Sequence, residues 1–102
     1  MQKEILFRAD GNSEIGLGHL YRLFSLIEML KEHFKFTFVS SETSTVNIIP
    51  NSYQLKIIPS QITIKEEPEW ISKEFDKNNT LLIADGYQFN SSYQRKIKGK
   101  GF

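Results

Sequence analysis

The sequence contains no cysteine, only three prolines and no long apolar run. Without cysteine the chain can form neither a disulfide nor a thiolate metal site, and a cytoplasmic location is the default expectation. No apolar stretch approaches the roughly 20 residues that a membrane-spanning helix needs. A charge interrupts the short apolar run near the start, which argues against a signal peptide. The net charge is only +1, from 13 basic and 12 acidic side chains, so no charge excess points to nucleic acid.

Apolar runs and amphipathic stretches alternate along the 102 residues. Short apolar runs bounded by turn residues predict buried parallel strands, and apolar residues three or four apart predict helices. The predicted strands cover residues 3–9, 36–39, 53–58 and 80–84. The predicted helices cover residues 18–33, 43–49, 66–75 and 91–98, the last capped by Ser91 or Ser92. The pattern predicts an α/β fold: a Rossmann-like parallel sheet with helices on both faces, in strand order 3-2-1-4.

The last residues of the sequence have a pattern that usually precedes another strand. A helix followed by Gly99-Lys100-Gly101-Phe102 normally leads into a further parallel strand. We therefore expect residues 1–102 to be part of a larger protein, with a naturally short protein as the alternative. A sheet that lacks its next strand exposes unpaired backbone groups. The isolated chain is accordingly predicted to self-associate or to be marginally stable.

A glycine-rich loop, Gly16-Leu17-Gly18-His19, joins the first strand to the first long helix. In a parallel sheet this junction lies at the carboxyl edge, where ligands bind. Glycines allow a ligand to approach the backbone, and a helix N-terminus offers unpaired N–H groups to an anion. The spacing matches neither the dinucleotide fingerprint nor the lysine-containing phosphate loop. An ordinary turn before a helix remains the alternative.

His19, which follows the glycines, indicates a specific chemical role for this loop. The positive end of the helix dipole disfavours an imidazolium ion, so we expect His19 to be neutral near neutral pH and able to act as a general base. A partly exposed histidine without a role is the alternative. The sequence shows no cluster of metal ligands, and neither a metal nor another cofactor is predicted.

Two aspartates end predicted neighbouring strands, Asp10 the first strand and Asp85 the fourth. They flank the topological switch point of the sheet, so Asp10, His19, Asp85 and Tyr87 are expected to converge on one crevice. Either aspartate is a candidate for orienting His19 or for binding substrate hydroxyls.

Two arginines flank the same region of the chain. Arg8 precedes Asp10 by two residues, and Arg22 lies one helical turn beyond His19 on the same helix face. Both are candidates for substrate binding. An ion pair with Asp10 or Glu14 is the alternative for either arginine.

These motifs carry a family resemblance. The segments Phe7-Arg8-Ala9-Asp10 and Ile15-Gly16-Leu17-Gly18-His19-Leu20-x-Arg22 resemble the start of the UDP-2,4-diacetamido-2,4,6-trideoxy-β-L-altropyranose hydrolases of pseudaminic acid biosynthesis. The run Leu81-Leu82-Ile83-Ala84-Asp85-Gly86-Tyr87 is similar to a second landmark of that family, a strand ending in Asp-x-Tyr. Spore-coat polysaccharide proteins of the SpsG type are also similar.

The resemblance implies a two-domain architecture of the GT-B kind. Residues 1–102 would form part of the N-terminal Rossmann-like domain, and the absent C-terminal domain would supply most of the UDP site. The resemblance implies His19 as the catalytic base. The implied substrate-binding residues are Arg8, Asp10, Gly16, Gly18, Arg22, Asp85 and Tyr87.

The implied activity is hydrolysis of a UDP-linked amino or deoxy sugar at its anomeric C–O bond, releasing UDP and the free sugar. A GT-B glycosyltransferase and a non-catalytic sugar-nucleotide-binding module are the alternatives. Gly86 departs from the Asp-His-Tyr motif of the pseudaminic enzymes, which leaves the identity of the sugar open.

Overall fold

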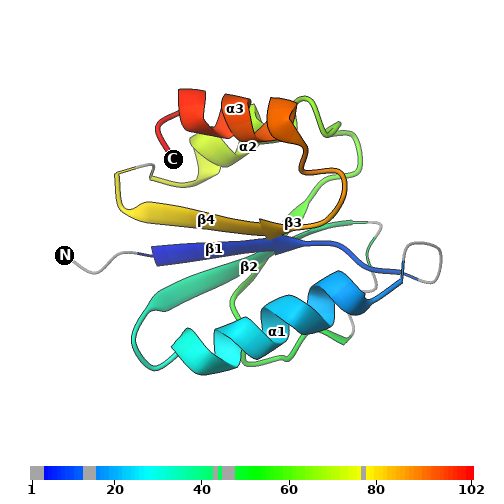
Figure 1. The fold of residues 1–102 in the computed structure, drawn as a ribbon, viewed down its shortest axis with the longest axis vertical. Coiled ribbons are helices and arrows are strands. Elements are labelled where there is room, and N and C mark those ends of the chain that lie inside the picture. Colours follow the sequence, from blue (N-terminus) through cyan, green and yellow to red (C-terminus); the bar gives the residue numbers. More distant parts are fainter. Residues whose placement is uncertain (1–3, 13–15, 43, 45–47, 77) are drawn as a thin grey trace.

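The computed structural model describes residues 4–12, 16–42, 44, 48–76 and 78–102. Four strands form one parallel sheet in the order β3-β2-β1-β4. The strands are β1 (Glu4–Ala9), β2 (Lys35–Ser41), β3 (Leu55–Ile58) and β4 (Thr80–Asp85). Helix α1 (Gly18–Leu30) covers one face of the sheet, and α2 (Glu67–Glu74) and α3 (Ser91–Gly99) cover the other (Figure 1). The predicted Rossmann-like sheet with helices on both faces is therefore confirmed, strand order included.

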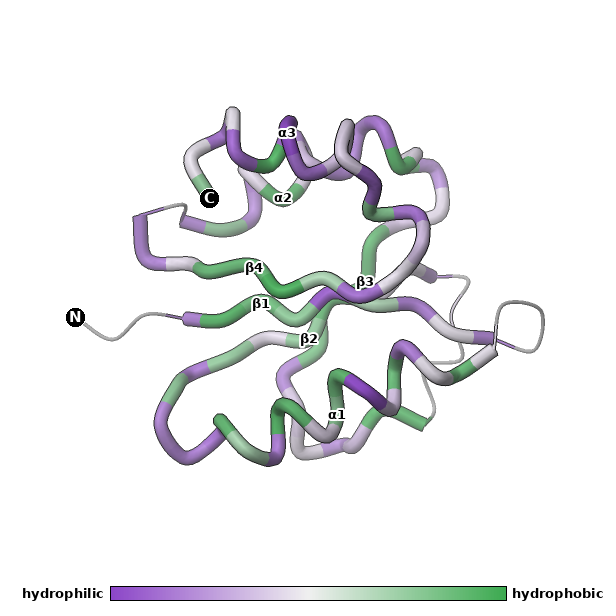
Figure 2. Tube along the Cα trace, viewed as in Figure 1, coloured by the Kyte–Doolittle hydropathy of each residue, from purple (hydrophilic) through white to green (hydrophobic). Residues whose placement is uncertain are grey.

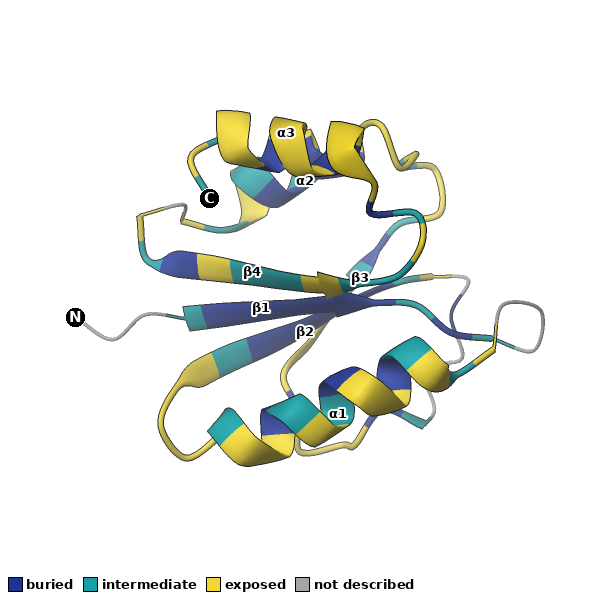
Figure 3. Ribbon diagram, viewed as in Figure 1, coloured by how far each residue is buried: buried dark blue, intermediate teal, exposed yellow. Residues whose placement is uncertain are grey.

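Strand β1 is the buried centre of the sheet, because β2 pairs with it on one side and β4 on the other. Successive side chains of a strand point to opposite faces. Ile5 and Phe7 accordingly pack into the core beneath α1, whereas Leu6 packs into the core beneath α2 and α3. Figure 2 shows apolar residues along β1 and β4, and Figure 3 shows that the outward faces of the helices are exposed.

Strand β4 lies at an edge of the sheet and is much less buried than β1. Thr80 is the one buried residue of β4, and Leu81 is 53% exposed, although this segment is as apolar as β1. Among the described strands only β1 pairs with β4. The opposite edge is formed by the four-residue strand β3, which carries Lys56 and is followed by Pro59.

The ends of the helices differ from the sequence-based bounds. Helix α1 ends at Leu30, and residues 31–33 form a turn instead of continuing the helix. Asn90, and neither Ser91 nor Ser92, caps α3, because its Oδ1 accepts a hydrogen bond from the backbone N–H of Tyr93 at 3.0 Å.

The helix predicted over residues 43–49 falls mainly outside the described residues, and residues 44, 48 and 49 belong to no α-helix. Throughout the ranges that the structure describes, every helix is too short or too polar to traverse a lipid bilayer.

Candidate active site

The carboxyl ends of β1 and β4 meet at one edge of the sheet, because Ala9 is aligned with Asp85 in the parallel register. Helix α1 begins at the same edge, at Gly18. This arrangement brings His19, Asp85 and Tyr87 together, as the sequence predicts. Asp10 lies at the same edge but has a different set of partners.

The glycine-rich loop adopts a backbone that glycine favours, and no described side chain caps the start of α1. Gly16 has φ +83° and its N–H bonds to the carbonyl of Asn12 at 2.8 Å. Leu17 stands at the cap position without a side-chain hydrogen bond, and the first turn of α1 carries no acidic residue. A Cβ added at Gly18 would meet nothing within 4 Å. Among the described residues, the positive end of the α1 dipole therefore lies beside His19 with no side-chain cap.

His19 and Asp85 form the central contact of the site. Nδ1 of His19 lies 3.0 Å from Oδ1 of Asp85, and the two side chains are 17% and 21% exposed. An ionised carboxylate can only accept hydrogen bonds, so Nδ1 carries the proton in this contact. In the neutral ring the lone pair then remains on Nε2. A carboxylate that orients a histidine in this way prepares the other ring nitrogen for proton transfer.

Arg22 binds the same carboxylate from one turn further along α1. Its Nη2 donates to Oδ1 of Asp85 at 2.9 Å, and its Nε forms a second hydrogen bond to Oδ2. Partial burial raises the pKa of Asp85, but the hydrogen bonds from Arg22 and His19 outweigh burial and hold this pKa below its usual value. Asp85 is therefore ionised at neutral pH.

Tyr87 completes a pocket at the edge of the sheet. The tyrosine is 94% exposed, yet its ring meets the His19 ring edge-on, with centroids 5.3 Å apart. Gly18, His19, Arg22 and Tyr87 line a pocket of about 300 Å³. An uncapped helix end, an oriented imidazole and a guanidinium thus surround one space, and an anionic substrate is the kind of ligand that this set suits.

Arg8 lies away from this pocket, buried between two carboxylates, with only 2% of its side chain exposed. Its Nη1 and Nη2 donate to Asp10 at 2.6 and 2.9 Å. Its Nε and Nη2 donate to Glu67 at 3.0 and 2.8 Å. Burial opposes the charge of Arg8, but these hydrogen bonds raise its pKa further above the usual value. The structure therefore shows the ion pair with Asp10 that the sequence left as an alternative; Glu14 lies outside the described residues.

Asp10 holds several segments together at the edge of the sheet. Besides Arg8, its carboxylate accepts hydrogen bonds from the Ser41 N–H at 2.8 Å, the Ser44 hydroxyl at 2.9 Å and the Gln88 amide at 3.2 Å. Burial raises the pKa of Asp10, but its bonds to Arg8, Ser41 and Ser44 outweigh that effect and lower the pKa to about 2. Asp85, and not Asp10, is the aspartate that contacts His19.

Sequence reasoning missed the partners of this buried cluster. Glu67 begins α2 and also accepts a hydrogen bond from the Tyr93 hydroxyl, and the Phe89 ring centroid lies 5.0 Å from the guanidinium carbon of Arg8. An arginine in a strand buried on both faces requires an acidic partner, and this requirement is the signal that was available. It did not identify which glutamate, because Arg8 and Glu67 are 59 residues apart.

Gly86 has a structural reason to be glycine. Its φ is +156°, and a Cβ there would lie 2.5 Å from Oε1 of Gln88 and 3.1 Å from the Phe89 ring. A histidine at this position, as in the Asp-His-Tyr motif, would require Gln88 to move, and Gln88 holds Asp10.

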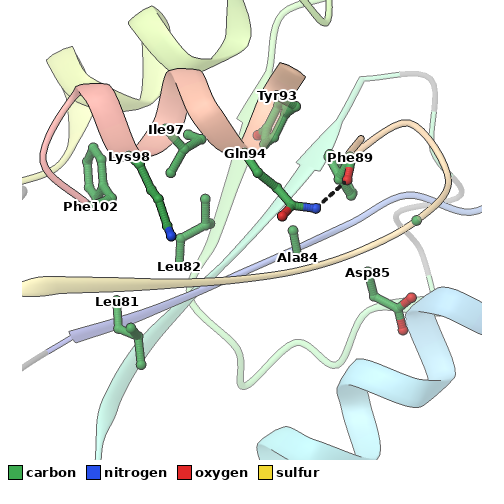
Figure 4. A pocket seen from close by; sticks show the side chains of 11 residues that line it. Leu81, Leu82, Ala84, Asp85, Phe89, Tyr93, Gln94, Ile97, Lys98 and Phe102 are labelled. Carbon is green, nitrogen blue, oxygen red and sulfur yellow. Dashed lines mark hydrogen bonds between the residues drawn. The ribbon is translucent and has the colours of Figure 1, made fainter. Parts of the chain in front are cut away.

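A larger pocket of about 590 Å³ lies along the open edge of β4, beneath α3. Figure 4 shows Leu82 on β4 facing Ile97 and Phe102 across it and Ala84 facing Gln94, with Lys98 reaching from α3 toward the strand. Neither His19 nor Arg22 lines this pocket. We place the candidate active site in the smaller pocket, because it gathers the groups capable of proton transfer and anion binding.

No protein-family model matches the chain, and no curated protein matches it. Within the described part of the chain, no three histidine or acidic side chains lie close enough together to hold a metal ion. The functional assignment therefore depends on motif spacing and on the geometry of this pocket.

Proposed function

We propose that this chain is the catalytic N-terminal part of a nucleotide-sugar hydrolase that acts in the cytoplasm, in bacterial nonulosonic-acid or surface-polysaccharide biosynthesis. The substrate is a UDP-linked amino or deoxy sugar, and the products are UDP and the free sugar. The observation that carries this proposal is the 3.0 Å contact between His19 Nδ1 and Asp85, which directs Nε2 of a helix-start histidine to proton transfer.

In the proposed reaction, Nε2 of His19 accepts a proton from a water molecule as the water oxygen bonds to the anomeric carbon. The bond between that carbon and the oxygen of the diphosphate breaks, and its electron pair leaves with UDP. Asp85 holds the imidazole and stabilises the positive charge that develops on it. UDP is a good leaving group, so the step needs little acid assistance.

The remaining residues of the pocket bind the substrate in this proposal. Gly16 and Gly18 allow the backbone at the start of α1 to approach the diphosphate, and Arg22 supplies a full positive charge. Tyr87 offers an exposed ring beside His19 for the sugar.

Arg8 and Asp10 have a different role from the pocket residues in this proposal. Both are engaged in the buried cluster, so we assign them to shaping the edge of the sheet and not to direct contact with substrate.

We further propose that a second Rossmann-like domain of the GT-B kind supplies most of the UDP site. Residues 1–102 alone should then bind UDP with a Kd no lower than about 1 mM, as measured by titration calorimetry. Micromolar binding by this chain would place the nucleotide site within these residues and contradict the two-domain assignment.

The test is an assay of the complete gene product with candidate UDP-sugars. Release of UDP without any acceptor supports hydrolysis, release only with an acceptor supports a glycosyltransferase, and no release supports a binding module. In ¹⁸O-labelled water the label should enter the sugar and not UDP. Label in the phosphate would mean P–O cleavage and would contradict the mechanism.

His19→Asn tests the base directly. The variant should fold normally and lose about 10²–10⁴-fold in kcat, the usual scale of general-base catalysis, with similar substrate affinity. Full activity in His19→Asn would remove His19 from the mechanism.

A further inference from the structure

One carboxylate in the candidate active site serves two side chains of the same helix. Oδ1 of Asp85 lies 3.0 Å from Nδ1 of His19 and 2.9 Å from Nη2 of Arg22, and Oδ2 also bonds to Nε of Arg22. We propose that Arg22 is a positioning residue for the base: it fixes the Asp85 carboxylate against Nδ1 of His19. The catalytic role of Arg22 rests on the proposed function, whereas its effect on the Asp85 carboxylate and the His19 ring does not.

The fixing of Asp85 follows from the shape of the guanidinium. Nε and Nη2 form a planar fork that engages both carboxylate oxygens and sets the orientation of the carboxylate plane. His19 and Arg22 are three residues apart on α1, so the fork and the imidazole reach Asp85 side by side. An ammonium group would supply the same charge without setting that plane.

Arg22 also lies close to the ring that it would help to position. Asp85 from β4 and Arg22 from α1 are the charged groups shown against His19, and Tyr87 from the loop after β4 contacts its ring. Nη2 of Arg22 lies 3.0 Å from Nδ1 of His19, and a guanidinium can only donate. The Nδ1–H tautomer is therefore favoured only while both nitrogens donate to the Asp85 carboxylate, whose orientation the fork sets.

An alternative role for Arg22 is an ordinary surface ion pair that fastens α1 to β4. The side chain is 66% exposed, and such pairs generally contribute little to folding. The two roles differ in what they do to the His19 ring: a fastening pair leaves its tautomer unchanged when Arg22 is replaced.

The test is NMR of the histidine rings in the 102-residue protein, with two substitutions. Arg22→Gln removes the fork, so the ring of His19 should lose its preference for the Nδ1–H tautomer, as read from its ring ¹⁵N shifts. Arg22→Lys keeps the charge but not the fork, so the tautomers should become mixed in this variant as well.

Two controls accompany these variants. Exposed His33 is an internal reference whose ring signals should not change. Arg95→Gln removes an exposed arginine on α3 and should leave the His19 signals unchanged. Unchanged His19 signals in Arg22→Gln, or an equal change in Arg95→Gln, would overturn the inference.

Kinetics separate this inference from the proposed function. In the complete gene product, kcat should fall in Arg22→Gln and in Arg22→Lys and should stay near the wild-type value in Arg95→Gln. Absence of any UDP-sugar hydrolysis by the wild type would contradict the proposed function alone, because the NMR result decides the positioning role without substrate.

Discussion

Strands β1 and β4 are neighbours with similar apolar sequences, and each ends at an aspartate, but the two aspartates have different surroundings. Asp10 follows the central strand, so segments from several parts of the fold close around its carboxylate. Asp85 ends the edge strand and remains 21% exposed beside His19. The position of a strand in the sheet therefore decides whether its terminal carboxylate stabilises the fold or remains available for chemistry.

The comparison extends to the arginine that binds each aspartate. Arg8 is buried and engages two carboxylates, whereas Arg22 is mostly exposed and shares its single carboxylate with a histidine. Breaking a buried ion pair leaves an uncompensated charge in the interior, whereas water compensates a broken exposed pair. Substitutions around Asp10 should accordingly affect stability, and those around Asp85 should affect activity.

The largest effect on stability is expected from Arg8→Leu. The change leaves the carboxylates of Asp10 and Glu67 buried without their cation, so the free energy of unfolding should fall by about 3–5 kcal/mol. Urea unfolding followed by circular dichroism measures the loss. If the variant does not fold, Glu67→Gln provides a milder test of the same cluster. An effect no larger than that of Arg95→Leu, on the exposed face of α3, would contradict the structural role of the cluster.

Asp10→Asn should have a smaller effect that depends on pH. The pKa of Asp10 is lowered from 3.8 to about 2, so the ionised form stabilises the folded state above about pH 4. This contribution, roughly 2 kcal/mol, is lost as pH falls toward 2, where the folded protein also binds the proton. Wild type should therefore exceed Asp10→Asn in stability at neutral pH and converge with it in acid. Unfolding curves that stay equally separated over this range would show that Asp10 does not titrate as proposed.

The sequence was sufficient for the architecture because each local signal agreed with the fold. Alternating apolar runs and amphipathic helices determine the parallel sheet, and the right-handedness of crossovers between parallel strands determines which face each helix covers. The cap of α3 was misplaced by one or two residues, since Asn90 and the two serines after it are all good capping residues.

The candidate site was only partly predictable. The junction of strand and helix placed His19 and Asp85 at one edge, because parallel strands end together. Which aspartate orients the histidine depends on loop conformation and on the partners of Arg8. One of those partners, Glu67, comes from a helix far along the chain, and no local pattern encodes that pairing.

Asp85→Asn should affect activity more than stability, the opposite of what is expected for Asp10→Asn. The carboxylate is partly exposed, so the free energy of unfolding should change by less than about 1 kcal/mol. The amide can present its N–H group to Nδ1 and thereby favour the unproductive tautomer of His19, so kcat should fall by at least about 10²-fold in the complete gene product. Measuring both quantities in Asp10→Asn and Asp85→Asn tests the comparison. A stability loss at Asp85 as large as at Asp10 would remove the distinction between the two strands.

Substitutions at the open edge of β4 should affect stability least. Their main effect should be on the self-association of the chain. The segment 81–84 is apolar, contains no proline and carries no charge, whereas natural edge strands are often protected by lysine or proline. The other edge has that protection, because β3 is short, carries Lys56 and is followed by Pro59. We therefore expect the 102-residue chain to self-associate through β4.

Leu81→Lys tests this expectation with little cost to folding. The Leu81 side chain is 53% exposed, and a change at such a site usually alters the free energy of unfolding by no more than about 0.5 kcal/mol. Sedimentation velocity over a series of protein concentrations should show association of the wild type and a larger monomer fraction in Leu81→Lys. Leu55→Lys places the same substitution on β3, beside Lys56, and should associate as the wild type does. A wild-type chain that stays monomeric, or equal effects of the two substitutions, would show that the open edge of β4 does not control association.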